Sequence, residues 1–329
     1  MIISRTPFRI SFFGGGTDFP IWYRNNSSKI INVAINKYCY VNVRKLPPFF
    51  KYKFRLRYHQ TEEVKSINKI QHPTVRESLK FLKYNDQFEM IHNADLPAQS
   101  GLGASSSFSV GLLNCLHALN NRYVSKKNLA NQAIFIEQNL VRDFVGSQDQ
   151  VAASFGGFNI IDFYGNNYKV NQIPLSYKNV KKLEESLLLV FSGFSRSASK
   201  VEKKKIKRFS KNVSYLKEIN KISHDAEERI HTSKNIISDF AELLNKHWYY
   251  KKKLTESVSN STINNLINLG LKNGAEGAKI LGAGDGGFIL FLTDKKNIQK
   301  LKKKFSNKLS LELNFDSTGS QIIYFSENE

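Results

Sequence analysis

The chain has 329 residues, a formal net charge of +21, 41% hydrophobic residues and 23% charged residues. This length allows a sizeable core and about two domains, and the composition is typical of a globular protein. The two cysteines, Cys39 and Cys115, are too few for a disulfide framework or a zinc cluster. No apolar run reaches the roughly 18–20 residues that span a bilayer, and residues 1–13 lack the pattern of a signal peptide. These features predict a cytoplasmic protein without a membrane partner.

The excess of positive charge has three interpretations. A basic surface attracts nucleic-acid phosphates, but the sequence contains no helix-turn-helix, zinc-finger or aromatic RNA-binding motif. The lysines can instead cover the outer faces of helices, as in residues 295–305, where Ile298, Leu301 and Phe305 recur at helical spacing. A positive potential also attracts small anionic substrates. We favour a solvated basic surface and expect no nucleic-acid partner.

The first half of the chain alternates strands and helices around glycine-rich turns. Strands are expected at residues 2–13, 29–46, 51–58, 87–93 and 158–164. Helices are expected at residues 74–84, 108–119 and 125–146. The first of these helices begins at Thr74 with a capping box, and the third begins at Ser125 and ends at Gly146.

The second half restarts with an apolar strand and continues with long amphipathic helices. Strands are expected at residues 187–193, 279–281, 288–292 and 321–326. Helices are expected at about residues 197–220, 223–250, 259–272 and 295–305. This order predicts two α+β domains, at residues 1–185 and 186–329, with the last strand in the second domain.

A glycine- and serine-rich loop at residues 96–107, "LPAQSGLGASSS", precedes the helix at 108–119. The first turn of a helix has free backbone N–H groups and a partial positive charge, so such a loop can hold a phosphate. An ordinary N-capped helix with a glycine turn gives the same pattern. The loop lacks the lysine of the G-x-x-x-x-G-K-[ST] motif.

Two further glycine clusters interrupt the strands. In "GGGTD", residues 14–18, the glycines indicate a sharp turn or a close approach to a ligand, and Thr17 and Asp18 can bind hydroxyl groups. A plain hairpin loop is the alternative. Arg9 lies in the preceding apolar strand and suggests an anion or carboxylate partner. In "GAGDGG", residues 282–287, the glycines allow close approach to a phosphate or to the first loop, or form a flexible turn.

Two carboxylates lie between the second and third of these loops. Glu137 falls on the apolar face of the helix at 125–146, so its charge must be paired or bind a metal. A metal ligand and a salt-bridged core residue both fit. Asp149 follows Ser147, which can cap a short helix in which Asp149 is favoured by the helix dipole. A general base is the other interpretation of Asp149.

Together the three loops resemble the motifs of the GHMP kinases. "PAQSGLGASSS" is similar to the phosphate loop of that family, "TPFRISFFGGGTD" to its N-terminal motif, and "KILGAGDGGFILF" to its C-terminal glycine motif. Asp285 occupies a position that is usually glycine in the last motif. The resemblance covers nearly the whole chain. It implies a two-domain α+β fold, with a ribosomal protein S5 domain 2-like N-terminal domain and a ferredoxin-like C-terminal domain.

The resemblance also implies a role for each candidate residue. ATP would bind the loop formed by Pro97, Ser100, Gly101, Leu102, Gly103, Ala104, Ser105, Ser106 and Ser107. Ser105 and Glu137 match the ligands of Mg²⁺, and Asp149 matches the catalytic aspartate, which takes or orients the proton of the attacking hydroxyl. Arg9 matches the basic residue that stabilises the nucleophile and the transferred phosphoryl group, and Asp18 matches the ligand of a sugar hydroxyl.

Within the family, the chain is most similar to kinases of D-glycero-D-manno-heptose 7-phosphate, which phosphorylate the anomeric oxygen. The segments behind this are "FRISFFGGGTDFP", "GSQDQVAASFGGFN" and "FSGFSRSASKVE". Galactokinases have Glu-His where this chain has two glycines, which disfavours galactose. Substrate contacts are expected from Gly15, Gly16, Thr17, Asp18, Arg196 and Gly284.

Three alternatives stay open in the sequence. L-fucose kinases carry similar motifs, so an unphosphorylated sugar also fits the pattern. A nucleic-acid-binding protein on a kinase-like scaffold is the alternative from another class, although it would have no use for a magnesium site. A monomer and a homodimer both fit the sequence.

Overall fold

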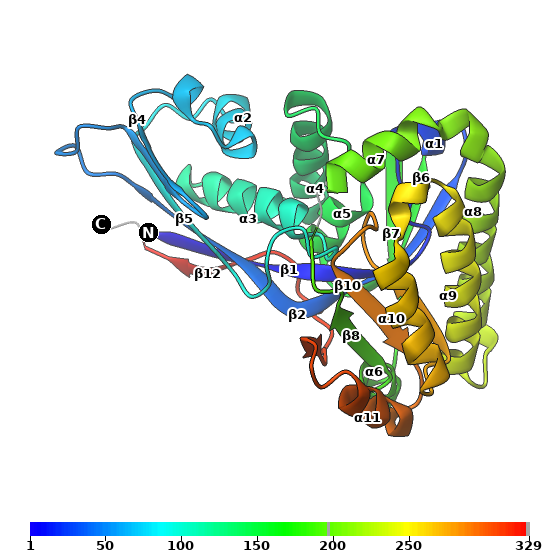
Figure 1. Cartoon of the computed structure of the whole chain (residues 1–329). Coiled ribbons are helices and arrows are strands. Elements are labelled where there is room, and N and C mark those ends of the chain that lie inside the picture. The colour runs from blue at the N-terminus through cyan, green and yellow to red at the C-terminus, as the bar shows by residue number, and fades with distance from the viewer. Residues whose placement is uncertain (196–197, 327–329) are drawn as a thin grey trace.

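Two β-sheets organise the chain in the computed structural model, which describes residues 1–195 and 198–326 (Figure 1). The strands of the first sheet are β1 (Ile2–Phe13), β2 (Ser28–Lys45), β3 (Phe54–Arg57), β4 (Thr61–Val64), β5 (Phe88–Ala94), β6 (Phe158–Tyr164), β7 (Asn167–Gln172) and β12 (Gln321–Phe325). Those of the second sheet are β8 (Leu187–Phe191), β9 (Gly277–Ile280), β10 (Phe288–Leu292) and β11 (Ser310–Leu311).

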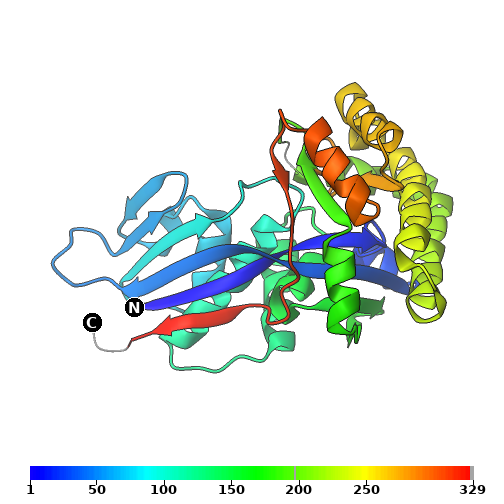
Figure 2. The same ribbon diagram turned by 90° about the horizontal axis from the view of Figure 1, so that it is seen from below.

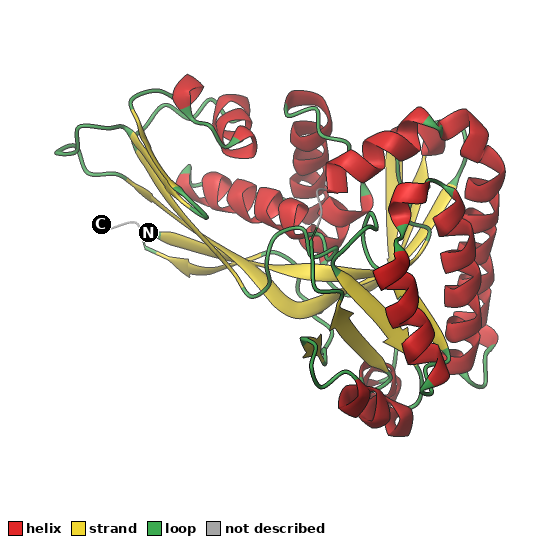
Figure 3. Cartoon of the chain, viewed as in Figure 1, coloured by secondary structure: helices red, strands yellow, loops and turns green. Residues whose placement is uncertain are grey.

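Helices pack around these sheets (Figure 3). They are α1 (Pro20–Tyr23), α2 (Pro73–Phe81), α3 (Ala104–Leu119), α4 (Lys126–Phe135), α5 (Gln148–Phe155), α6 (Tyr177–Glu184), α7 (Ala198–Lys207), α8 (Phe209–Thr232), α9 (Ile236–Lys253), α10 (Ser261–Lys272) and α11 (Lys295–Lys304). Short helical segments lie at η1 (Ile67–Lys69), η2 (Ile136–Leu140) and η3 (Glu256–Val258). In the described part of the chain, none of these helices has the length and apolar character to cross a membrane.

The first sheet has the order β12-β1-β2-β5-β3-β4, with β6 on β2 and β7 on β6. The long strand β2 pairs with β6 along its first half and with β5 along its second half. The second sheet has the antiparallel order β11-β8-β10-β9. The α+β fold class expected from the sequence is therefore confirmed.

Helix α3 packs against one face of the first sheet. It packs on β1 and β2, and a Cβ atom added to Gly111 would lie 2.8 Å from the Thr6 hydroxyl. The Ser4 hydroxyl donates to the Gly111 carbonyl at 3.0 Å. Because α3 lies so close to the strands, its N-terminus is held at a fixed position beside β1.

The two sheets share one hydrophobic core. Phe12 and Phe13, at the end of β1, contact Phe240 of α9 with ring centroids 5.9 and 5.1 Å apart. Figure 1 shows α9 and α8 side by side at the end of the molecule away from the N-terminus. This contact joins the carboxyl end of β1 to the helices of the second part of the chain.

The last strand departs from the expected second domain at residues 186–329. Strand β12 pairs antiparallel with β1, from Ile2 with Phe325 to Arg5 with Gln321, and so completes the first sheet (Figure 2). The residues of a strand predict its type but not its partner, because pairing depends on distant parts of the chain. The boundary itself, just before β8, stays a prediction.

Several expected helix boundaries are wrong. Helix α2 begins at Pro73, one residue before the expected Thr74, because proline is favoured at the first helical position; its N-cap residue makes no side-chain cap. The helix that begins at Ser125 has the expected cap, but it ends in the π-helical segment η2 and not at Gly146. Helix α8 continues unbroken to Thr232, ten residues beyond the expected break.

Candidate active site

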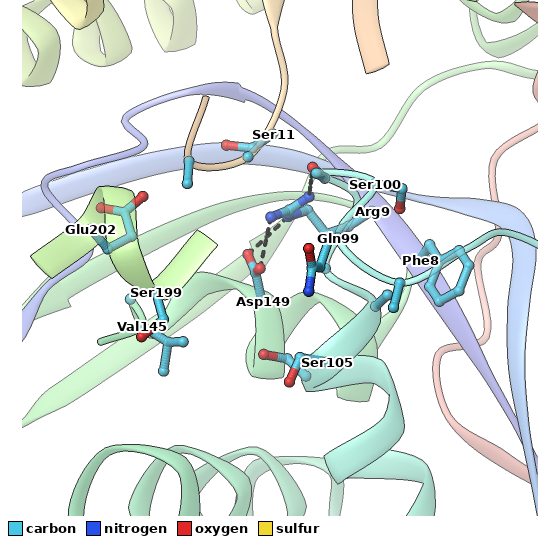
Figure 4. A pocket seen from close by; sticks show the side chains of 18 of the residues that line it. Phe8, Arg9, Ser11, Gln99, Ser100, Ser105, Val145, Asp149, Ser199 and Glu202 are labelled. Atoms are coloured by element: carbon cyan, nitrogen blue, oxygen red, sulfur yellow. Dashed lines mark hydrogen bonds and ion pairs between the residues drawn. The ribbon is translucent and has the colours of Figure 1, made fainter. Parts of the chain in front are cut away.

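A cavity of about 440 Å³ opens where the end of β1, the N-terminus of α3 and the second part of the chain meet (Figure 4). Its walls come from β1, the loop before α3, α5, α7, α9 and the loop after β9. The predicted site residues that line it are Arg9, Gly15, Gly16, Asp18, Ser100, Gly101, Gly103, Ala104, Ser105, Ser106 and Asp149. Residues predicted from three distant segments of the sequence therefore surround one space.

Other predicted residues lie behind the wall of this cavity. Leu102 is buried in the core, and the Ser107 hydroxyl donates to the Pro7 carbonyl at 2.8 Å. Thr17 is buried, and its hydroxyl donates to the Gly14 carbonyl. The remaining predicted residues outside the lining are Pro97, Glu137 and Gly284. Arg196 lies outside the described residues.

The loop before α3 places free backbone donors at the cavity. Gly103 is the N-cap of α3 with φ of +80°, and Ala104, Ser105 and Ser106 form the first turn. The backbone N–H of Arg9 donates to the Leu102 carbonyl at 3.0 Å, which ties the loop to β1. Since the first-turn N–H groups have no helical acceptors, this turn is suited to an anion.

Arg9 and Asp149 form an ion pair at the centre of the cavity (Figure 4). Arg9 Nε donates to Asp149 Oδ1 at 2.8 Å, and Arg9 Nη2 donates to Asp149 Oδ2 at 2.7 Å. The third guanidinium nitrogen, Nη1, donates to the Gly101 carbonyl at 2.7 Å. The Arg9 side chain is 6% exposed and that of Asp149 is 24% exposed. These contacts hold the Asp149 carboxylate beside the loop before α3, and part of the carboxylate stays exposed to the cavity.

Asp18 is a buried carboxyl beside this pair. Oδ1 accepts from the Gly16 N–H and Oδ2 accepts from Gln148 Nε2, each at 2.9 Å. Burial is the main cause that raises the pKa of Asp18 from 3.8 to about 6, and the charge of Asp149 adds to it. A Cβ atom at Gly146 would lie 1.9 Å from Asp18 Oδ2, so glycine is needed there.

The replacement Asp18→Asn is expected to stabilise the protein at alkaline pH. Because the folded-state pKa of Asp18 is raised, its ionisation lowers the free energy of unfolding as pH rises from about 4 to 6, and the loss persists above that. Without this ionisation, the free energy of unfolding of the variant should exceed that of the wild type by about 3 kcal/mol at pH 8 and by little at pH 4. Urea denaturation at both pH values measures the difference. The exposed control Asp86→Asn should follow the wild type, and an equal gain from Asp18→Asn at both pH values would contradict the prediction.

Glu137 is buried behind the first turn of α3. Its Oε2 accepts from the Ser106 hydroxyl at 2.9 Å and from Gln150 Nε2 at 2.6 Å, whereas Oε1 has no hydrogen-bond partner among the described residues. Burial raises the pKa of Glu137 to about 7. A buried carboxylate with one unpaired oxygen and no basic partner fits a place beside a cation.

The third glycine loop packs directly against the first. A Cβ atom at Gly282 would lie 2.6 Å from Gly101 Cα, and one at Gly287 would lie 2.4 Å from the Ser100 carbonyl. Of the alternatives left by the sequence, close approach to the first loop is therefore confirmed. Asp285 has φ of +59°, which explains why glycine is usual at that position.

An aromatic end of the cavity was not predicted. Tyr58, His72, His92 and Phe108 line it, with the His72 and His92 rings 5.0 and 4.8 Å from the Phe108 ring. Burial lowers the pKa of His72 to about 4 and also lowers that of His92, so both rings are neutral at pH 7. An uncharged aromatic wall suits a flat heterocycle. These residues come from separate elements and share no sequence motif.

Comparison with known proteins gives two family matches. Residues 70–157 match the GHMP kinases N terminal domain, and residues 233–311 match the GHMP kinases C terminal domain. The chain is 30% identical over 324 residues to a D-glycero-alpha-D-manno-heptose 7-phosphate kinase of Campylobacter jejuni, covering 92% of this chain and 93% of that protein. It is 24% identical to a bifunctional fucokinase/GDP-fucose pyrophosphorylase of Arabidopsis thaliana, covering 93% of this chain but 31% of that protein.

A solved structure has the same fold. A D-glycero-D-manno-heptose 1-phosphate kinase from Bacteroides thetaiotaomicron superposes with a TM-score of 0.81 over 99% of this chain and 100% of that chain, at 20% identity. The fold, both family matches and the full-length likeness agree with the resemblance seen in the three motifs. The chain therefore belongs to the GHMP kinase family and is an ATP-dependent sugar kinase.

Proposed function

We propose that the chain transfers the γ-phosphoryl group of ATP to the anomeric hydroxyl of D-glycero-D-manno-heptose 7-phosphate, giving the 1,7-bisphosphate for the synthesis of nucleotide-activated heptose. The near full-length likeness to the Campylobacter jejuni kinase carries this choice of sugar. L-fucose is the second candidate, because the chain is also similar to the Arabidopsis thaliana fucokinase, at lower identity.

In this proposal ATP lies along one half of the cavity. Its phosphates accept hydrogen bonds from the first-turn N–H groups of α3, at Ala104, Ser105 and Ser106, where the helix dipole favours negative charge. The adenine occupies the neutral aromatic end beside Phe108. The sugar lies on the other side of the Arg9–Asp149 pair, with Asp18 accepting from a hydroxyl group.

Phosphoryl transfer depends mainly on positioning and charge neutralisation. Asp149 accepts the proton of the anomeric hydroxyl as its oxygen forms a bond to the γ-phosphorus, and the bond from that phosphorus to the β–γ bridging oxygen breaks. Arg9, held against both Asp149 oxygens, orients the carboxylate and balances charge on the transferred group. ADP leaves with the bridging oxygen.

The residues present also fit Mg²⁺ carried by ATP. No cluster of three or more His, Cys, Asp or Glu side chains that could hold a metal occurs in residues 1–195 and 198–326. Mg²⁺ commonly takes one or two protein ligands and completes its shell with phosphates and water. Glu137, through its unpaired Oε1, and Ser105 would hold it, and it would neutralise charge on the β- and γ-phosphates.

The variant Glu137→Gln is expected to raise the Mg²⁺ concentration for half-maximal activity by about 10-fold, because a neutral amide binds the cation more weakly. The amide oxygen can keep the hydrogen bonds from Ser106 and Gln150, so the fold should be retained. Activity titrated with Mg²⁺ at fixed ATP measures the shift. Glu63→Gln, an exposed change on β4, is the matched control. Identical Mg²⁺ titrations of Glu137→Gln and the wild type would reject the assignment.

ADP release with Mg-ATP and a panel of sugars tests the proposed function. The panel contains D-glycero-D-manno-heptose 7-phosphate, sedoheptulose 7-phosphate, L-fucose, galactose and mannose. We expect turnover of the heptose phosphate, with a product that carries phosphate at C1 in its phosphorus NMR spectrum. Preferred turnover of L-fucose would replace the heptose phosphate by the second candidate, and turnover of neither would reject both.

A further inference from the structure

Three buried lysines gather at the sugar side of the cavity. They are Lys205 of α7, Lys251 of α9 and Lys279 of β9, which are 8%, 4% and 2% exposed, and all three line the cavity. None of the three was predicted as a site residue, although Lys279 is the first residue of the C-terminal glycine motif. Lysine is rarely buried unless its charge is paired.

Each ammonium group is anchored to the backbone around the cavity. Lys251 Nζ donates to the carbonyls of Ile280 and Gly282 at 3.1 and 2.6 Å. Lys205 Nζ donates to the Ala283 carbonyl at 2.8 Å. Because an ammonium group has three N–H donors, Lys251 retains one N–H that no described acceptor uses.

Lys279 is anchored to β1. Its Nζ donates to the carbonyls of Ser11 and Phe12 at 3.1 and 2.7 Å, and His247 Nδ1 lies 3.5 Å away. These contacts occupy its N–H groups, so Lys279 supplies no further hydrogen bond and can act on a ligand only through the charge of its protonated form. The anchors also fix its ammonium group close to the end of β1.

The charges of these lysines are not balanced. Lys205 forms an ion pair with Glu202 at 2.9 Å. Neither Lys251 nor Lys279 has a carboxylate within ion-pair distance among the residues that the structure describes. Burial, together with the positive charge of Lys205, lowers the pKa of Lys251 to about 7. Burial and the neighbouring positive charges also lower the pKa of Lys279, so a bound anion would stabilise the protonated form of both amines.

The ammonium groups of Lys205 and Lys251 lie beside the third glycine loop, which packs on the loop before α3. Figure 4 shows Glu202 and Phe8 on opposite sides of the Arg9–Asp149 pair. Glu202 pairs with Lys205, so Lys205 lies on the Glu202 side of the Arg9–Asp149 pair. A negative group bound there would lie on the side of that pair where the proposed function puts the sugar.

We propose that Lys205, Lys251 and Lys279 bind an anionic group of the sugar substrate, a phosphate monoester, and thereby select a phosphorylated sugar over a neutral one. The inference rests on the proposed function, since it takes the second substrate to be a sugar phosphate. The spare N–H of Lys251 donates to the phosphate, and the other two lysines supply charge. The site then distinguishes substrates by an interaction that neutral sugars lack.

The first test compares Lys251→Met with Lys253→Met, an exposed change on the same helix. For D-glycero-D-manno-heptose 7-phosphate, Lys251→Met should raise KM by roughly 10- to 100-fold, the range for a lost charge-assisted hydrogen bond. The KM for ATP should stay within about twofold of the wild type. Lys253→Met should change neither constant. If Lys251→Met does not fold, as judged by circular dichroism, Lys205→Met takes its place.

The second test needs no turnover. With the phosphate loop saturated by a non-hydrolysable ATP analogue and Mg²⁺, inorganic phosphate should raise the melting temperature of the wild type and of Lys253→Met, but not of Lys251→Met. Loss of this response in Lys251→Met alone supports the anion site, whichever sugar phosphate is the substrate. No response in the wild type overturns it.

The two hypotheses fail in different ways. Absence of turnover of the heptose phosphate by the wild type contradicts the proposed function. Turnover by the wild type with an unchanged KM in Lys251→Met contradicts the anion site alone. An equal rise of KM for ATP and for the sugar phosphate also overturns it, because the lysine would then only hold the glycine loop in place.

Discussion

The variant Asp149→Asn is expected to lower kcat by about 1,000-fold or more, with ATP still bound. Asparagine cannot accept the proton of the attacking hydroxyl, and it cannot accept both hydrogen bonds that Arg9 donates to the carboxylate. The helix α5 should remain, because Asp149 is only its second residue and Ser147 does not cap it by a side-chain hydrogen bond. Steady-state kinetics and circular dichroism measure the two effects.

The matched control is Asp143→Asn, which makes the same chemical change at another carboxyl that lines the cavity. Asp143 Oδ1 accepts only from the Phe144 N–H, and we expect kcat to stay within about threefold of the wild type. An Asp149→Asn protein that loses its fold would instead support a structural role for that residue. A folded variant that keeps more than a tenth of the activity would exclude Asp149 as the base.

The variant Gly282→Ala is expected to lower the free energy of unfolding by about 3 kcal/mol or more. A Cβ atom there would lie 2.6 Å from Gly101 Cα, and the φ of +63° disfavours any L side chain. Since Gly101 belongs to the loop beside α3, the same change should raise the KM for ATP by roughly 10-fold. Urea denaturation and ATP titration measure these effects.

The variant Gly165→Ala separates the effect of the steric contact at Gly282 from the effect of the positive φ. Gly165 has φ of +54° in the turn between β6 and β7, but nothing lies within 4 Å of the added Cβ atom. We expect a loss of about 1 kcal/mol and no change in the KM for ATP. Equal losses in the two variants would mean that the contact between the two glycine loops contributes nothing.

The phosphate-loop candidates illustrate what local sequence can predict. Gly103 and the serines after it were recognised because a glycine turn before a helix has its effect within a few residues. The helix begins at Ala104, however, and not at Phe108, so Ser105 and Ser106 belong to its first turn. The motif located the glycine turn before this helix, whereas the helix boundary was beyond the reach of a hydrophobic pattern.

The burial of Glu137 was predicted correctly, although the helix on which that prediction rested ends earlier than expected. Its burial followed from a helical pattern that included Phe144, but the helix passes into the π-helical segment η2 before that residue. A π turn shifts the side chains that follow it, and hydrophobic spacing does not reveal the shift. The partners of Glu137, Ser106 and Gln150, come from two other helices, so only the folded chain could show them.

The lysines and the aromatic end were missed for the same physical reason. Lys251 and Phe108 lie in ordinary amphipathic or apolar segments, and their own neighbours in sequence indicate only burial. Lys279 begins the C-terminal glycine motif, but nothing in that motif shows that its side chain reaches the cavity. Their importance arises from long-range packing, which brings α9, β9 and α3 to one cavity. Because the sequence contains many lysines, the few buried ones cannot be told from the exposed ones by residue type.

The pairing of β12 with β1 also constrains how the molecule is made. Strand β1 is synthesised first and β12 after all the other elements, so the ribosome releases nearly the whole chain before one edge of β1 is covered. An uncovered strand edge can pair with another polypeptide. Contacts between such distant segments also form slowly. Until β12 emerges, the newly made chain is therefore open to misassembly along this edge, and a chain cut short before β12 would keep the edge uncovered.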